Sequence, residues 1–66
     1  MQLTLNGEPR QCDDGLTVAG LMESLGYTGK RVAVERNGDI VPKSAHPTTA
    51  LAEGDKLEVV VAVGGG

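Results

Sequence analysis

The carboxyl end of the chain carries the residues that point most directly to chemistry. Gly64, Gly65 and Gly66 follow the most apolar run of the sequence, residues 57–63. Glycine has no Cβ and adopts almost any backbone conformation, so a glycine run fits a slot that is too narrow for other residues. Three extended residues reach about 10 Å. We predict a flexible tail, residues 64–66, that enters partner active sites with the Gly66 carboxylate as the reactive group; a terminus without chemistry is the alternative.

Elsewhere the sequence offers few residues arranged for catalysis. Cys12 and His46 are the single members of their types, which excludes an internal disulfide and leaves too few ligands for a zinc or [2Fe–2S] site. We interpret Cys12 as a half-buried strand residue and His46 as a solvated loop residue. Ser24 and Ser44 have no His and carboxylate at catalytic spacing, and no phosphate-binding motif occurs. We therefore predict a chain that is not an enzyme and that binds no metal or cofactor itself.

Several carboxylates fall in predicted turns, where such side chains are usually solvated and Asp caps backbone groups. They are Glu8, Asp13, Asp14, Glu53 and Asp55. We expect no acid–base catalysis from them.

Composition and charge limit the classes of partner that the chain is expected to bind. The 66 residues allow one small domain, and the net charge of −3 argues against nucleic acid and anionic membranes as partners. Tyr27 is the only aromatic residue, so a platform for stacking bases is missing as well. The sequence shows no leader and no long apolar run, and we expect a cytoplasmic protein whose partner has a basic surface.

The first third of the chain predicts a hairpin followed by a helix. Met1, Leu3 and Leu5 alternate with polar residues, as in a strand with one covered face, and Asn6-Gly7 suits a type I′ turn into a return strand over residues 9–13. Thr17 is placed to cap a helix, and Gly26 is placed to end it. The apolar stripe of that helix comprises Val18, Leu21, Met22 and Leu25.

The rest of the chain predicts three more strands. Residues 31–36 and Ile40-Val41 flank a second Asn-Gly turn, Asn37-Gly38. Residues 42–49 read as a loop with one helical turn near residues 44–46. Residues 57–63 form the closing strand, which is apolar on both sides and therefore suits the centre of a sheet.

This order of elements predicts an α+β fold of the ubiquitin-like β-grasp type. A mixed sheet of about five strands carries one main helix on one face, and the last strand lies parallel to the first because the crossover must be right-handed. We assign residues 1–63 to this domain and residues 64–66 to the tail. An SH3-like or OB barrel fits the early amphipathic helix less well.

The chain also resembles the ThiS family of sulfur carriers in thiamin thiazole biosynthesis over essentially its whole length. The paired glycines Gly65-Gly66 are the specific part of the resemblance. The residues that carry it are Leu5-Asn6-Gly7, Thr17-Val18, Leu21, Leu25, Val34-Glu35-Arg36-Asn37, Ile40-Val41-Pro42, Gly54-Asp55 and Val63-Gly64-Gly65-Gly66.

The resemblance implies a set of partners and a reaction at Gly66. An E1-like adenylating enzyme (ThiF) would use ATP to form an acyl-adenylate there, and sulfur from a persulfide protein would convert it to a thiocarboxylate. A thiazole synthase (ThiG) would then receive the sulfur. ATP would belong to the partner.

Binding should come from the folded domain, because ordering each tail residue costs on the order of 1 to 2 kcal/mol. We expect the open side of the sheet to be the docking surface, with Val60 and Ala62 from the closing strand. Two other functions stay open: a small subunit of molybdopterin synthase with the same tail chemistry, and a noncatalytic β-grasp interaction module.

Overall fold

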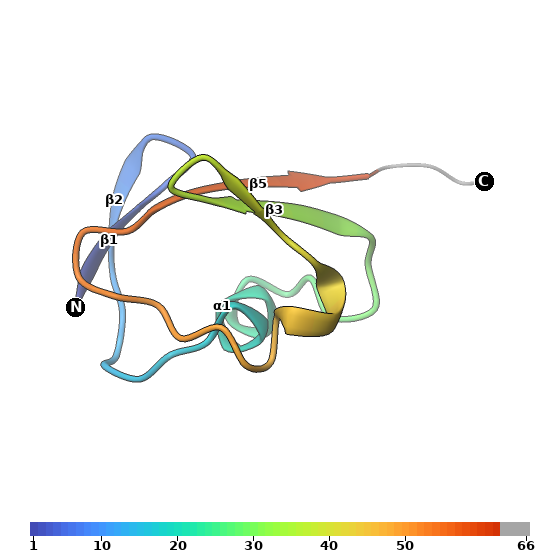
Figure 1. The fold of residues 1–66 in the computed structure, drawn as a ribbon, viewed down its shortest axis with the longest axis horizontal. Helices are drawn as coiled ribbons and strands as arrows, with labels where there is room; N and C mark the ends of the chain where they lie inside the picture. Colours follow the sequence, from blue (N-terminus) through green and yellow to red (C-terminus); the bar gives the residue numbers. More distant parts are fainter. Residues whose placement is uncertain (63–66) are drawn as a thin grey trace.

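The computed structural model describes residues 1–62, which form one mixed β-sheet covered on one face by a helix (Figure 1). The strands are β1 (Gln2–Leu5), β2 (Glu8–Gln11), β3 (Val32–Arg36), β4 (Asp39–Val41) and β5 (Lys56–Val61). Within this range the sheet has five strands in the order β2-β1-β5-β3-β4. β5 lies in the centre, parallel to β1 and antiparallel to β3. The predicted β-grasp fold is confirmed.

The first hairpin contains the predicted Asn-Gly turn. Asn6 and Gly7 have φ angles of 50° and 83°, the left-handed pair that a type I′ turn requires. β2 is shorter than the predicted residues 9–13, because Gln11 already lies opposite Gln2 at the start of β1. Beyond that pair Cys12 still bonds to Met1: its N–H donates a 2.8 Å bond to the Met1 carbonyl, and its carbonyl accepts a 2.6 Å bond from the amino terminus.

Helix α1 (Val18–Ser24) begins and ends as predicted. The Thr17 hydroxyl accepts a 3.1 Å hydrogen bond from the Gly20 N–H, and Gly26 follows the helix with a φ of 79°. Gly20 has a packing role, because a Cβ at this position would lie 2.8 Å from Leu16 Cδ1. The glycine therefore lets Leu16 fold back onto the helix.

The second hairpin repeats the turn chemistry of the first. Asn37 and Gly38 have φ angles of 52° and 90° and join β3 to β4. The chain then forms one turn of 3₁₀ helix, η1 (Lys43–Ala45), where the sequence predicted a single helical turn. β5 starts one residue before the predicted strand because Lys56 pairs with Thr4 of β1.

The core lies between α1 and the sheet. Its buried residues come from the helix, from three strands and from the segment before β5: Leu3, Val18, Leu21, Met22, Val34, Leu51, Leu57 and Val59. Across residues 1–62, no helix has the length and apolar character needed to cross a membrane. The predicted boundary between Val63 and Gly64 lies outside the described residues.

Candidate functional site

The candidate site is the end of the sheet at which β5 finishes. Val61 pairs with Val32 of β3, and the Ala62 N–H donates a 2.9 Å hydrogen bond to the Arg31 carbonyl. The last described residue is therefore bonded to the residue that precedes β3. The predicted tail residues Gly64, Gly65 and Gly66 lie outside the described residues.

The two predicted docking residues lie on the open face of the sheet. Alternate β5 side chains point to opposite faces, and Leu57 and Val59 are buried against the helix side. Val60 is 65% exposed, and Ala62, two residues further along, is exposed on the same side. An exposed Val in a central strand is unusual for a residue type that is most often buried.

Two apolar residues that the sequence analysis did not select extend this surface. Ala33 of β3 is exposed and lies directly opposite Val60, and Ile40 of β4 is 66% exposed. We call Ala33, Ile40, Val60 and Ala62 the open-face patch. The two-residue turn at Asn37-Gly38 fixes the register between β3 and β4, and counting from that turn would have placed Ile40 on this face.

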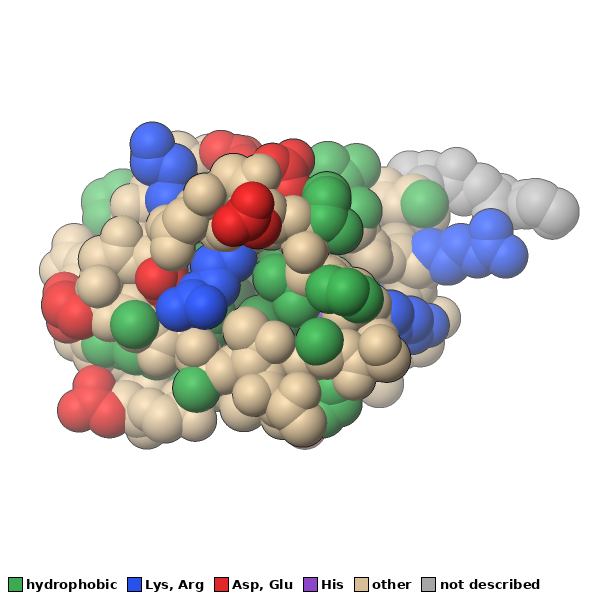
Figure 2. Space-filling view, viewed as in Figure 1, with side chains coloured by type: hydrophobic (Ala, Val, Ile, Leu, Met, Phe, Trp, Pro, Cys, Tyr) green, Lys and Arg blue, Asp and Glu red, His purple; other side chains and the backbone are tan. Residues whose placement is uncertain are grey.

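Acidic side chains border the open-face patch. Glu35 lies opposite Glu58 on β5 and opposite Ile40 on β4, so two like charges face each other across the sheet. Such pairs destabilise a sheet slightly. Figure 2 shows acidic and hydrophobic side chains side by side along the upper, open side of the molecule. The surface therefore offers an apolar contact with a negative border, which suits a partner with basic residues.

Asp55, which was expected in a solvated turn, is instead buried at 5% exposure, and that expectation is wrong. Its carboxylate accepts hydrogen bonds from Arg36 Nε at 2.7 Å and from Asn37 Nδ2 at 3.1 Å. A third comes from the Ala52 N–H at 2.8 Å. The residue is buried because the turn before β5 folds onto the end of β3. It fastens these two strands rather than acting on a substrate.

These contacts also set the protonation of Asp55. Burial raises the pKa of its carboxyl, but the hydrogen bonds that it accepts and the positive charge of Arg36 outweigh that effect. The net result is a pKa below the ordinary value for Asp. The other four carboxylates that the sequence placed in turns, Glu8, Asp13, Asp14 and Glu53, are exposed as expected.

His46 is also buried, at 7% exposure, which contradicts its prediction as a solvated loop residue. Its Nε2 lies 3.1 Å from the Val41 carbonyl, which requires Nε2 to carry a proton and donate. Its own carbonyl accepts a 2.9 Å bond from the Ala19 N–H of α1. The η1 turn folds this segment onto the helix, so His46 joins β4 to α1.

Cys12 is half-buried and packs against the core, as predicted, although it lies just beyond the end of β2. Ser24 donates a 2.7 Å hydrogen bond to the Leu21 carbonyl of its own helix. Neither residue lies at the end of the sheet where β5 finishes.

Comparisons with known proteins agree with this geometry. The model of the ThiS family matches residues 3–66. Two thiazole synthases, from Paramagnetospirillum magneticum and Magnetococcus marinus, are 48% and 42% identical over 66 residues. The chain is covered completely in both alignments but spans only 20% of either synthase.

A solved structure covers the whole chain as well. The crystal structure of the thiamine biosynthesis protein ThiS from Geobacter metallireducens superposes with a TM-score of 0.83 at 35% identity, and both chains are covered over 100% of their length. These findings support a sulfur carrier in thiamine synthesis. With a family model that matches nearly every residue, the chain belongs to the ThiS family.

Proposed function

We propose that this chain carries sulfur on the carboxyl group of Gly66 and delivers it to a thiazole synthase in thiamine biosynthesis. The observation that carries the proposal is the family match, which continues through the terminal glycines to residue 66. The fold supports it, because the central strand β5 leads directly to that tail and is bonded to β3 up to Ala62.

The chemistry explains why such a carrier requires an activating partner. A terminal carboxyl has a pKa of about 3.3 to 3.7, so at neutral pH it is an ionised and poor electrophile. In the proposed reaction a carboxylate oxygen attacks the α-phosphate of ATP in an E1-like adenylating enzyme, and pyrophosphate leaves. A persulfide sulfur then attacks the carbonyl carbon, and AMP leaves. Reduction of the resulting acyl disulfide by a thiol gives the thiocarboxylate.

The glycine tail fits this role because one carboxyl must enter at least two active sites. A side chain on residues 64–66 would have to fit both channels, whereas glycine presents only backbone. Ordering the tail costs on the order of 1 to 2 kcal/mol per residue, so affinity must come from the folded domain. The open-face patch, with Val60 and Ala62, is the proposed docking surface because it is apolar and exposed and includes Ala62, the last described residue before the tail.

The thiazole synthases among the relatives support the choice of the second partner. A segment 48% identical to this chain forms one fifth of the synthase from Paramagnetospirillum magneticum. Carrier and synthase segments are thus present in one polypeptide there, as expected for proteins that act on one reaction. A carrier for molybdopterin synthesis would not be expected to share a chain with a thiazole synthase.

Reconstitution tests the proposal. The chain is incubated with the adenylating enzyme, ATP, a persulfide sulfur donor, a thiol reductant, the synthase and its remaining substrates, and thiazole is measured by mass spectrometry. We expect product in the full mixture and none when either ATP or the carrier is left out. Product without the carrier would refute the role, and a carrier that never gains sulfur would identify an interaction module.

A further inference from the structure

The helix-covered side of the molecule has a groove at the end of the sheet where β5 finishes. The groove lies between α1, the loop that leads into β3, and the η1 segment, and it has a volume of about 270 Å³. Met22, Tyr27, Val32 and Pro47 supply much of its apolar lining. Val32 and Val34 point to the helix side of β3, whereas Ala33 belongs to the open-face patch. The groove and the patch are therefore on opposite faces of the sheet.

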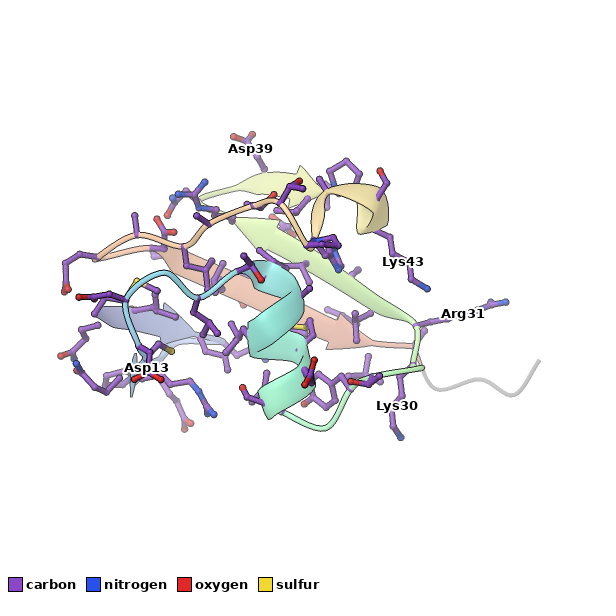
Figure 3. All side chains as sticks on the ribbon, turned by 90° about the horizontal axis from the view of Figure 1, so that it is seen from below. Asp13, Lys30, Arg31, Asp39 and Lys43 are labelled. Atoms are coloured by element: carbon purple, nitrogen blue, oxygen red, sulfur yellow. The ribbon has the colours of Figure 1, made fainter. Side chains whose placement is uncertain are left out.

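Basic residues gather around this groove. Lys30, in the loop before β3, and Lys43, at the start of η1, line it, and Arg31 follows Lys30 in the sequence. These are three of the six basic residues of a chain with a net charge of −3. Figure 3 shows all three at the end of the molecule where β5 finishes, whereas Asp13 lies at the other end.

None of these three side chains pairs with a carboxylate among residues 1–62, where the ion pairs are Met1–Asp14 and Arg36–Asp55. Glu23 of α1 is the one carboxylate among the described lining residues. The described surface around the groove therefore has a positive balance next to an apolar floor.

The groove also adjoins the last described residues of the chain. Val32, which lines the groove, pairs with Val61, and the Arg31 carbonyl holds the Ala62 N–H. A protein that takes the tail into its active site must therefore bring its own surface close to Lys30 and Arg31.

We propose that this groove is a second docking surface, and that its occupant is a segment of the adenylating partner that presents an apolar side chain between carboxylates. The apolar floor would bury the side chain, and Lys30 and Lys43 would pair with the carboxylates at the rim. The enzyme would then hold the end of the carrier from both faces of its sheet. This inference rests on the proposed function, because it assumes that an adenylating enzyme receives the tail.

Charge reversal tests whether Lys30 and Lys43 contribute to binding at the groove. We expect Lys30→Glu and Lys43→Glu each to raise the KM for the carrier in the adenylation reaction by about tenfold at low salt, with kcat unchanged. The effect should shrink as salt rises, because screening weakens exposed charge pairs. Arg10→Glu is the matched control: it makes the same charge change on the edge strand β2, opposite Leu3, at the end of the sheet where β5 begins and away from both the groove and the open-face patch.

A substitution that covers the groove tests whether its apolar floor contributes to binding. Thr28 is exposed and lines the groove, so Thr28→Trp should cover the floor without disturbing the core, and it should raise the KM. Thermal unfolding of each variant confirms that it is folded. If the Lys30, Lys43 and Thr28 variants have the KM of the Arg10 control, the groove proposal is wrong while the carrier function stands. If the unmodified chain is never adenylated, the proposed function itself fails.

Discussion

The two ends of β5 are built differently. At its start, Leu57 is fully buried and Asp55 accepts hydrogen bonds from three residues, Arg36, Asn37 and Ala52. At its finish, Val60 and Ala62 are exposed, and Lys30 and Lys43 line a groove. One end holds the sheet together and the other end presents a surface. Changes at the start of β5 should therefore lower stability, and changes at its finish should lower activity.

The largest effect should come from the tail itself. Adding one residue after Gly66 moves the reactive carboxyl away from its position in the partner active site, and we expect sulfur loading to be lost completely. Thermal unfolding should not change, because the core and the sheet are formed by residues 1–62. Loading is followed by intact mass spectrometry. An extended chain that is loaded at the normal rate would contradict the proposed role of Gly66.

Asp55→Ala should have the largest effect on stability. It removes a buried carboxylate and leaves Arg36, Asn37 and the Ala52 N–H without their acceptor. We expect the free energy of unfolding to fall by about 2 to 4 kcal/mol, as measured by urea denaturation. Asp39→Ala, at an exposed carboxylate on β4, is the control and should change it by less than about 0.5 kcal/mol. Equal effects of the two substitutions would show that Asp55 does not fasten the strands.

Val60→Asp should weaken partner binding and leave stability nearly unchanged, in contrast to Asp55→Ala. It places a charge in the open-face patch beside Glu58, and we expect the KM for the carrier to rise about tenfold or more, equivalent to about 1.4 kcal/mol of binding. The free energy of unfolding should change by less than about 1 kcal/mol, within the range of strand propensities. Gln11→Asp, on the exposed edge strand β2, is the control for charge alone. If both variants have the same KM, the open-face patch is not the docking surface.

Asn6 tests how much a single side-chain amide contributes to the pairing of β1 with β5. Its side-chain amide accepts a 2.7 Å bond from the Val59 N–H and donates a 3.1 Å bond to the Val59 carbonyl, which extends the β1–β5 pairing. Asn6→Gly keeps the left-handed backbone and removes these bonds, and we expect a loss of about 1 to 2 kcal/mol in unfolding free energy. Asn6→Ala should lose about 1 kcal/mol more because of its positive φ. No loss in the glycine variant would show that the amide does not contribute.

The smallest effect should appear in the acid dependence of stability. The folded state lowers the pKa of Asp55, so its contribution is complete above the unfolded value of about 3.9 and is lost as the pH falls through the lower folded value. Asp55→Asn removes this titration. The difference in unfolding free energy between the two chains should therefore shrink as the pH falls below about 4. A constant difference would contradict the lowered pKa.

Local sequence signals predicted much of the fold. Both Asn-Gly turns need positive φ at two successive residues, and few other dipeptides meet that need. Thr17 caps α1 through an atom three residues away, so its role was visible within the sequence. The central place of β5 followed from its apolar residues on both faces.

The features that were not predicted from the sequence depend on tertiary contacts. Asp55 is buried by Arg36, which lies 19 residues earlier, and His46 is buried because η1 folds onto α1. Neither contact leaves a local pattern. Ile40 became part of the open-face patch through its register with Glu35, and Lys30 and Lys43 line one groove from the loop before β3 and from η1. The site therefore depends on contacts between segments that are far apart in the chain.

The position of the transferred sulfur tests the central claim most directly. The chain is loaded with the adenylating enzyme, ATP and a persulfide donor, and is then fragmented in a mass spectrometer. We expect that one oxygen has been replaced by one sulfur and that the change is confined to the fragment ending in Gly66. An added sulfur on the fragment that contains Cys12, with an unchanged carboxyl end, would contradict it.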